Sequence, residues 1–343
     1  MSFKSSYIYI FFVLASIILV RENFDFTTGD REAYLYGEWL AGSSIRDRLT
    51  NFIFTNLKFF GEILFCLLYY RNVFKLSTLL FLSTKFKDYL NKRIVYFSIL
   101  LALFAPVTLI FTSFAGKDIT AIFLASELCV EISSYYYKKK AYKFKFFKII
   151  KILIFSILLV YLRKLSAFFL LILLLNFFIL FNRNQFKNLP FILFPILIIS
   201  IFLFWDQLYG ILYEEFYYQY LASFSENATF SKTNPNFEFD NFLQNSYQMI
   251  TGVAPIHFSE SFNKAFLLLF NNFLTHIFTL ILGIIYFIKN LKIRNLFFFK
   301  AFFLISFFII NGFFSQNNPG GAIRFMSSVV PIYTTFIFTV LPE

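Results

Sequence analysis

The chain has 343 residues, of which 59% are hydrophobic and only 15% are charged, and its formal net charge is +12. Because soluble domains carry about 25% charged residues, this chain has too few polar side chains to cover a surface in water. Its 57 phenylalanines and positive mean hydropathy predict a chain built for the bilayer. The basic residues lie in short runs between apolar segments, so we expect no nucleic-acid partner.

The first apolar stretch covers residues 3–20 and contains the basic residue Lys4 before its apolar run. Such a short run is also typical of a cleaved signal peptide. However, no small-x-small cleavage site precedes Arg21. We therefore favour a retained first span, with the signal peptide as the alternative.

Spanning helices need about 20 apolar residues, and on this basis the chain is predicted to be an all-α, polytopic transmembrane bundle of about ten spans. The candidate spans are 3–20, 51–70, 94–114, 118–137, 147–162, 165–181, 189–205, 264–288, 296–315 and 324–341. The apolar segment 73–83 is too short to cross and is interpreted as an interfacial or re-entrant piece. Neither a sequence repeat nor a soluble second domain is evident, so residues 1–343 are expected to form a single integral membrane domain.

The basic residues of the loops predict the orientation. Loops 71–93 and 138–148 each contain six Lys or Arg, 182–188 contains two and 289–295 contains three. Loop 206–263 instead has one Lys and seven acidic residues. Ten spans with a cytoplasmic N-terminus place every basic-rich loop inside. The long segments 21–50 and 206–263 then lie outside.

Segment 147–181 would be about 50 Å long as one helix, which exceeds the thickness of a bilayer. It must therefore break. The pair Arg163-Lys164 lies near its middle and predicts a tight hairpin, although neither Gly nor Pro marks the turn.

Several cations lie at the predicted outer face, where the positive-inside rule disfavours them. They are Lys117, Arg163, Lys164 and Arg324, with further arginines such as Arg31 in the first outer loop. A charge at the membrane boundary is costly unless it is paired or useful. Together they predict a site for an anion such as a lipid-attached diphosphate. The alternative is that each one extends to lipid headgroups or pairs with a nearby acid.

Four residues are candidates for acid–base chemistry. Asp118 follows Lys117 at the start of a predicted helix, whose N-terminal amides favour an anion, although Asp118 could equally be only a helix-terminal charge. His257 and Glu260 lie three residues apart in the second outer loop, so they could act as base and orienter on one helical face. Asp30 is the acidic candidate of the first outer loop.

The interior of the spans is nearly free of charge, and its few acidic candidates are Glu62, Glu127 and Glu131. Glu127 and Glu131 are one helical turn apart and could line a pathway. Cys66 and Cys129 both fall in apolar segments, so we expect neither a disulfide nor a metal site. Motifs for nucleotide, dinucleotide or zinc binding are absent from the sequence, and no cofactor is predicted.

The layout of the chain is familiar. A short first span precedes an acidic and aromatic outer loop, and the Gly-Lys-Asp segment 116–118, the basic hairpin 163–164 and a large late outer loop follow. A Gly-Gly-x-x-Arg-Phe turn at 320–325 leads into a final span that contains proline. This order resembles that of the Wzy-type O-antigen and capsular polysaccharide polymerases of bacteria.

The resemblance implies a multi-pass enzyme of the bacterial inner membrane, with a helical bundle similar to the GT-C class and a periplasmic active site. Its partners would be undecaprenyl-diphosphate-linked oligosaccharide, membrane lipid and a possible chain-length regulator protein. Lys117, Arg163 and Arg324 would hold the diphosphate leaving group without a metal. A carboxylate or histidine of an outer loop would activate the acceptor hydroxyl.

Three alternatives stay open. An O-antigen ligase, or another glycosyltransferase that acts on lipid-phosphosugars, would need the same basic outer site. A flippase or transporter of lipid-linked oligosaccharide should show internal repeats and charge at mid-membrane, and neither is evident from the sequence. The third alternative is a scaffold subunit without catalytic activity.

Overall fold

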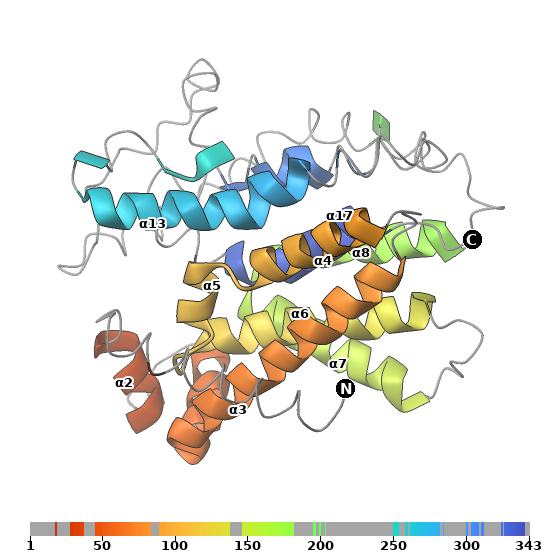
Figure 1. Cartoon of the computed structure of the whole chain (residues 1–343). Helices are drawn as coiled ribbons and strands as arrows, with labels where there is room; N and C mark the ends of the chain where they lie inside the picture. Colours follow the sequence, from red (N-terminus) through yellow and green to blue (C-terminus); the bar gives the residue numbers. More distant parts are fainter. Residues whose placement is uncertain are drawn as a thin grey trace. The chain divides into compact units, whose positions relative to one another are not determined.

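The structure is a computed structural model, and every regular element in its described part is a helix (Figure 1). It describes residues 28–37, 45–83, 89–137, 146–181, 250–253, 258–259, 261–281, 303–308 and 326–339. The single positions 18, 195, 196, 199, 203, 284, 300, 310, 311 and 324 are also described. The all-α prediction is thereby confirmed for these residues.

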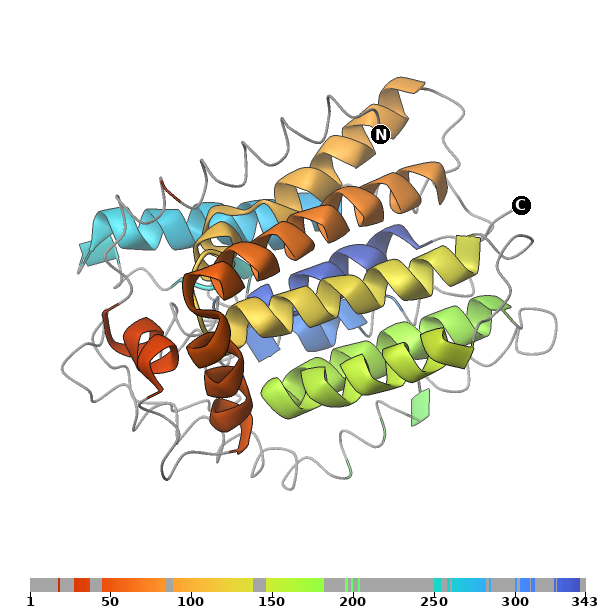
Figure 2. The same cartoon turned by 90° about the horizontal axis from the view of Figure 1, so that it is seen from below.

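The chain divides into two compact units. The first comprises Met1–Leu171 and Ser327–Pro342, and the second comprises Ile172–Met326. The elements of the first unit are α2 (Thr28–Tyr36), α3 (Ile45–Ser83), α4 (Tyr89–Leu103), α5 (Pro106–Phe111), α6 (Lys117–Tyr137), α7 (Phe146–Leu162), the start of α8 (Lys164–Phe181) and α17 (Val330–Phe338). Helix α6 lies at the centre of this unit, in contact with α3, α7 and α17 (Figure 2).

Two local signals set helix ends in the first unit. Gly37 ends α2 with a φ of 81°, and its N–H donates to the Ala33 carbonyl at 3.1 Å, as expected of a glycine in the left-handed region at a helix C-terminus. Pro106 opens α5 and holds the preceding Ala105 in an extended conformation, because a residue before proline is disfavoured in a helix. The predicted span 94–114 is therefore divided between α4 and α5.

Helix α3 corrects one expectation from the sequence. It runs from Ile45 to Ser83 with a single non-helical residue, Lys58, at φ 46° and ψ −135°. The prediction of a separate interfacial or re-entrant piece at 73–83 is wrong, because this segment continues the helix. Neither Gly nor Pro occurs between Glu62 and Ser83, so the basic residues interrupt the apolar pattern without breaking the helix.

Contacts between α3 and α6 fix their relative direction. Glu62 accepts a hydrogen bond from the backbone N–H of Ala115 just before α6, and Asn72 donates to Ser126 ten residues further along α3. The two helices therefore run in the same direction. In the predicted topology the spans 51–70 and 118–137 also cross in one direction, so the contacts agree with that alternation.

Helix α7 runs opposite to α6. Arg163, directly after α7, forms an ion pair with Asp118 at the start of α6, whereas Lys151 near the start of α7 binds Glu131. Arg163 is the one residue between α7 and α8, and the chain reverses there (Figure 2). The sequence prediction of a break at 163–164 is confirmed.

The exposed surfaces support a location in a membrane. Two helical stretches, Asp47–Leu80 and Phe262–Ile281, are long and apolar enough to cross one, and only 28% and 39% of their most apolar parts are buried. A core helix of a soluble protein would be mostly covered. Among the described side chains of α7, at 147–162, every exposed residue is apolar or tyrosine, as in Phe147, Leu153 and Ile157. An exposed apolar face that runs along a whole helix is unusual for a soluble monomer and suits contact with lipid.

The second unit contains α13 (Phe262–Asn272), which continues through the π-helical turn η3 (Phe273–Ile277). The C-terminal half of this helix places polar residues inside the unit, where Asn272 donates to the Thr251 carbonyl at 2.7 Å and the His276 ring packs edge-on against Phe307 at 4.6 Å between ring centroids. Both Asn272 and His276 are buried. The predicted span 264–288 is thus helical over its described part.

Candidate functional site

Several segments of the first unit meet at one end of it. They are α2, the part of α3 up to Glu62, the turn 112–116 before α6, and Arg163 after α7. The predicted topology assigns these segments to the outer side, except that Glu62 lies within the predicted span 51–70. We call their ionic residues, which are Arg31, Asp47, Glu62, Lys117, Asp118 and Arg163, the outer cluster.

Glu62 is the fully buried acid of the outer cluster. Its carboxylate accepts two hydrogen bonds from Arg31, from Nε at 2.7 Å and from Nη2 at 3.1 Å. It also accepts the backbone N–H of Ala115 at 2.7 Å. The hydrogen bond to Glu62 raises the pKa of Arg31. One carboxylate therefore ties α2 and the turn before α6 to α3.

Asp47 is the second acid of the outer cluster. The Tyr34 hydroxyl donates to Asp47 Oδ1 at 3.1 Å, and Lys117 Nζ lies 3.8 Å from the same oxygen. Tyr34 is buried beside Gly116, where an added Cβ would meet its ring at 3.7 Å. Lys117 is loosely paired and keeps 20% of its side chain exposed.

The third pair of the outer cluster joins Asp118 and Arg163. The two side chains form an ion pair and are 6% and 10% exposed. Asp118 lies in the first turn of α6, so its charge also suits the helix N-terminus. The structure thus brings together Lys117, Asp118 and Arg163, three of the residues predicted from sequence. Because each cation has a carboxylate beside it, the pairing expected in the alternative interpretation is present.

The structure describes less about the other five predicted site residues. Asp30 lies in α2 and Lys164 begins α8, but their side chains are outside the described part, as are His257 and Glu260 entirely. Arg324 is partly exposed and belongs to the second unit. The predicted roles of these five residues stay predictions.

Sequence reasoning missed Asp47 as a site residue and did not connect Arg31 with Glu62. Asp47 is one of several charges in a polar outer segment and carries no signal of its own. Glu62 does carry one, because a single acid within an apolar run needs a partner. Its partner Arg31 lies 31 positions away, and only the docking of α2 against α3 brings the two together.

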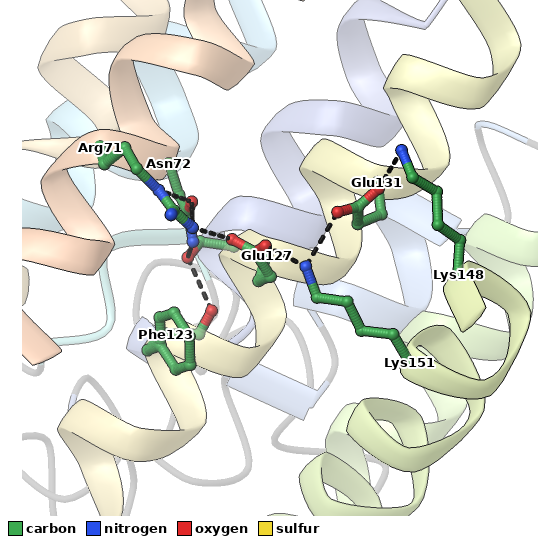
Figure 3. A network of polar contacts seen from close by, with 8 residues as sticks. Arg71, Asn72, Phe123, Glu127, Glu131, Lys148 and Lys151 are labelled. Carbon is green, nitrogen blue, oxygen red and sulfur yellow. Dashed lines mark hydrogen bonds and ion pairs between the residues drawn. The ribbon is translucent and has the colours of Figure 1, made fainter. Parts of the chain in front are cut away.

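Further along α3 and α6 from the outer cluster, a second set of charged and polar residues joins α3, α6 and α7 (Figure 3). We call it the charged network; it consists of Arg71, Asn72, Glu127, Glu131, Lys148 and Lys151. Glu127 is at its centre, with Arg71 Nη2 at 2.8 Å from one carboxylate oxygen and Lys151 Nζ at 2.5 Å from the other. Lys151 also contacts Glu131 at 2.8 Å, and Lys148 lies 3.8 Å from Glu131.

The charged network contains Glu127 and Glu131, the two acids that the sequence suggested could line a pathway along α6. Glu127 and Glu131 do share one face of the helix, as expected from their spacing. Their side chains are only 4% and 12% exposed, however, and both are paired with cations. These ion pairs therefore hold three helices together. The charges of the network that reach the surface are those of its cations.

Comparison of the chain with known protein families, curated proteins and solved structures finds no match. The resemblance to the Wzy-type polymerases therefore stays a prediction from the sequence.

Proposed function

We propose that this chain is a multi-pass glycosyltransferase of the bacterial inner membrane that polymerises undecaprenyl-diphosphate-linked oligosaccharide repeat units. The observation that supports the proposal is the outer cluster. Asp47, the adjacent pair Lys117-Asp118 and Arg163 come from three segments far apart in the sequence, yet they lie together at one end of the first unit. A site for a lipid diphosphate needs this combination of cations at the boundary of the membrane.

The chemistry follows from the pairing. The diphosphate of the donor would draw Lys117 and Arg163 away from Asp47 and Asp118, because a diphosphate carries more charge than a carboxylate. Charge that develops on the leaving group would then be stabilised by these fixed cations. The freed Asp118 or Asp47 would be placed to accept a proton from the acceptor hydroxyl. Tyr34, whose hydroxyl already donates to Asp47, would orient that carboxylate.

Deletion of the gene in its own host tests the activity. Surface polysaccharide would be separated on a gel, with lipid-linked intermediates extracted in parallel. Polymerisation requires that the ladder disappear while single-repeat product stays. A long polymer that accumulates on lipid would instead identify a ligase, and an unchanged ladder would refute any role in polysaccharide synthesis.

Substitutions at Arg163 test the site. Arg163→Gln alone leaves the buried Asp118 unpaired, so a loss of activity could reflect misfolding. The double variant Arg163→Gln/Asp118→Asn removes both charges and should restore the amount of protein in the membrane while polymerisation stays lost. Arg324→Ala is expected to abolish activity as well. Normal polymerisation in both the double variant and Arg324→Ala would mean that the diphosphate binds elsewhere.

One observation favours a second candidate, the translocation of lipid-linked oligosaccharide. The charged network lies about halfway along α6, and charge at mid-membrane is typical of transporters. The same deletion distinguishes the two functions. A translocase predicts that single repeat units accumulate in the cytoplasmic leaflet, whereas a polymerase predicts that they reach the periplasmic side.

A further inference from the structure

The exposed face of α3 changes character along the helix. At its outer end Phe59 and Phe60 are exposed. Between Gly61 and Leu80 the exposed residues are instead polar, namely Arg71, Lys75 and Thr78. Their spacing of four and three positions places them on one face. We call these three residues the α3 polar stripe.

The α3 polar stripe begins deep along the bundle. Helix α6 has 21 residues, so it is about 31 Å long, close to the thickness of the hydrocarbon core. Arg71 binds Glu127, the middle residue of α6. Yet half of the Arg71 side chain is exposed. An exposed guanidinium at this depth would be costly against lipid tails, so the stripe needs water or an anion beside it.

Other exposed surfaces at the same depth are different. Ile154 of α7, three residues beyond Lys151, is 48% exposed, and every exposed residue among the described side chains of that helix is apolar or tyrosine. Helix α7 therefore presents apolar surface for acyl chains beside the partly exposed Lys148 and Lys151, whereas the exposed residues of α3 at this depth are polar. A ligand that has both an anionic group and acyl chains matches this pair of surfaces.

The charge balance favours an anion. Arg71, Lys75, Lys148 and Lys151 exceed the carboxylates Glu127 and Glu131 by two charges. The carboxylates are 4% and 12% exposed, whereas Arg71, Lys148 and Lys151 are 50%, 34% and 33% exposed (Figure 3). The acids thus lie inside and the bases outside. The surface of this group of charges that faces away from Glu127 therefore carries a net positive charge.

We propose that the α3 polar stripe binds the phosphate of an anionic phospholipid headgroup. Arg71 holds phosphate oxygens with the part of its guanidinium turned away from Glu127, as the planar group allows. Lys75, one turn further, contacts the same headgroup, and the acyl chains lie on apolar surface such as that of α7. The stripe extends toward the C-terminal end of α3, which points to the side predicted to be cytoplasmic, where anionic lipids are abundant.

Cysteine labelling of the full-length protein tests the site. Lys75→Cys reports on the stripe and Ile154→Cys is the matched control on the apolar face, while native Cys66 and Cys129 are both buried. Thr78→Cys is a second reporter should the first variant not fold. Each protein is placed in phosphatidylcholine nanodiscs with or without phosphatidylglycerol and labelled with a neutral, water-soluble maleimide.

We expect Lys75→Cys to react and Ile154→Cys to stay unreactive. Phosphatidylglycerol should slow the labelling of Lys75→Cys by about fivefold, as expected for a contact worth about one unit-charge interaction in water. Adding Arg71→Gln should abolish that slowing. The proposal is overturned if neither reporter is labelled, or if phosphatidylglycerol slows the Arg71→Gln protein equally. Protection by inorganic pyrophosphate in phosphatidylcholine alone, with none by phosphatidylglycerol, would assign the site to a soluble anion instead.

Discussion

Replacement of Glu62 by glutamine should destabilise the first unit more than any other single charge-neutral change at its outer end. The carboxylate of Glu62 is fully buried and accepts three hydrogen bonds, two from Arg31 and one from Ala115. A glutamine of the same shape keeps one acceptor oxygen. Its NH2 group would then face either the guanidinium or the backbone N–H, donor against donor.

The magnitude follows from what stays unpaired. Removing one partner of a buried ion pair costs about 3–5 kcal/mol, but the Arg31 side chain is 25% exposed and water recovers part of this loss. A buried N–H that loses its acceptor costs about 1–3 kcal/mol. Because glutamine satisfies one of these two groups, we expect a loss of about 2–3 kcal/mol in the free energy of unfolding.

The measurement is unfolding in detergent, followed by circular dichroism, with Glu32→Gln as the matched control. Glu32 is the neighbour of Arg31 on α2 and is exposed, so its replacement should change stability by less than about 0.5 kcal/mol. Arg31→Gln combined with Glu62→Gln should lose less than the sum of the single changes. Equal stability of Glu62→Gln and Glu32→Gln would refute the reasoning.

Three further predictions concern packing and charge. Gly252→Ala should destabilise the protein by about 2 kcal/mol or more in the same unfolding assay, because Gly252 has φ +70° and an added Cβ would lie 2.1 Å from Asn272 Nδ2. The control Gly116→Ala should be neutral, because an added Cβ there would make only ordinary contacts. A double-mutant cycle of Lys151→Met and Glu127→Gln should give a coupling of about 1 kcal/mol, and additive losses would contradict the observed contact. Ile154→Asp should reduce the amount of protein in the membrane, measured by fractionation, whereas Ile154→Leu should not, because that surface of α7 is expected to face lipid.

Much of the helical layout could be predicted from the sequence. Apolar runs of the right length located α6, α7 and α8 to within a few residues, and the excessive length of 147–181 predicted the break at Arg163. These features depend on local length and hydrophobicity, which a single chain displays directly. The wrong interpretation of 73–83 has a local cause too: the basic residues after Tyr70 suggested a loop, but an α-helix tolerates them.

The candidate site was only half predictable. Lys117, Asp118 and Arg163 stand out because a charge at a membrane boundary is unusual in any context. Their carboxylate partners do not stand out in this way, since Asp47 is one acid among many in a polar segment.

The pairing itself was decided by tertiary structure alone. Glu62 meets Arg31 because α2 docks on α3, and Arg71 meets Lys151 through Glu127 because α6 separates α3 from α7. The sequence by itself determined the apolar helices α6, α7 and α8 and which charges are out of place in a membrane. Packing decided which of those charges neutralise one another, because ion pairs act over a few ångströms and their partners lie 17 to 70 positions apart in the chain.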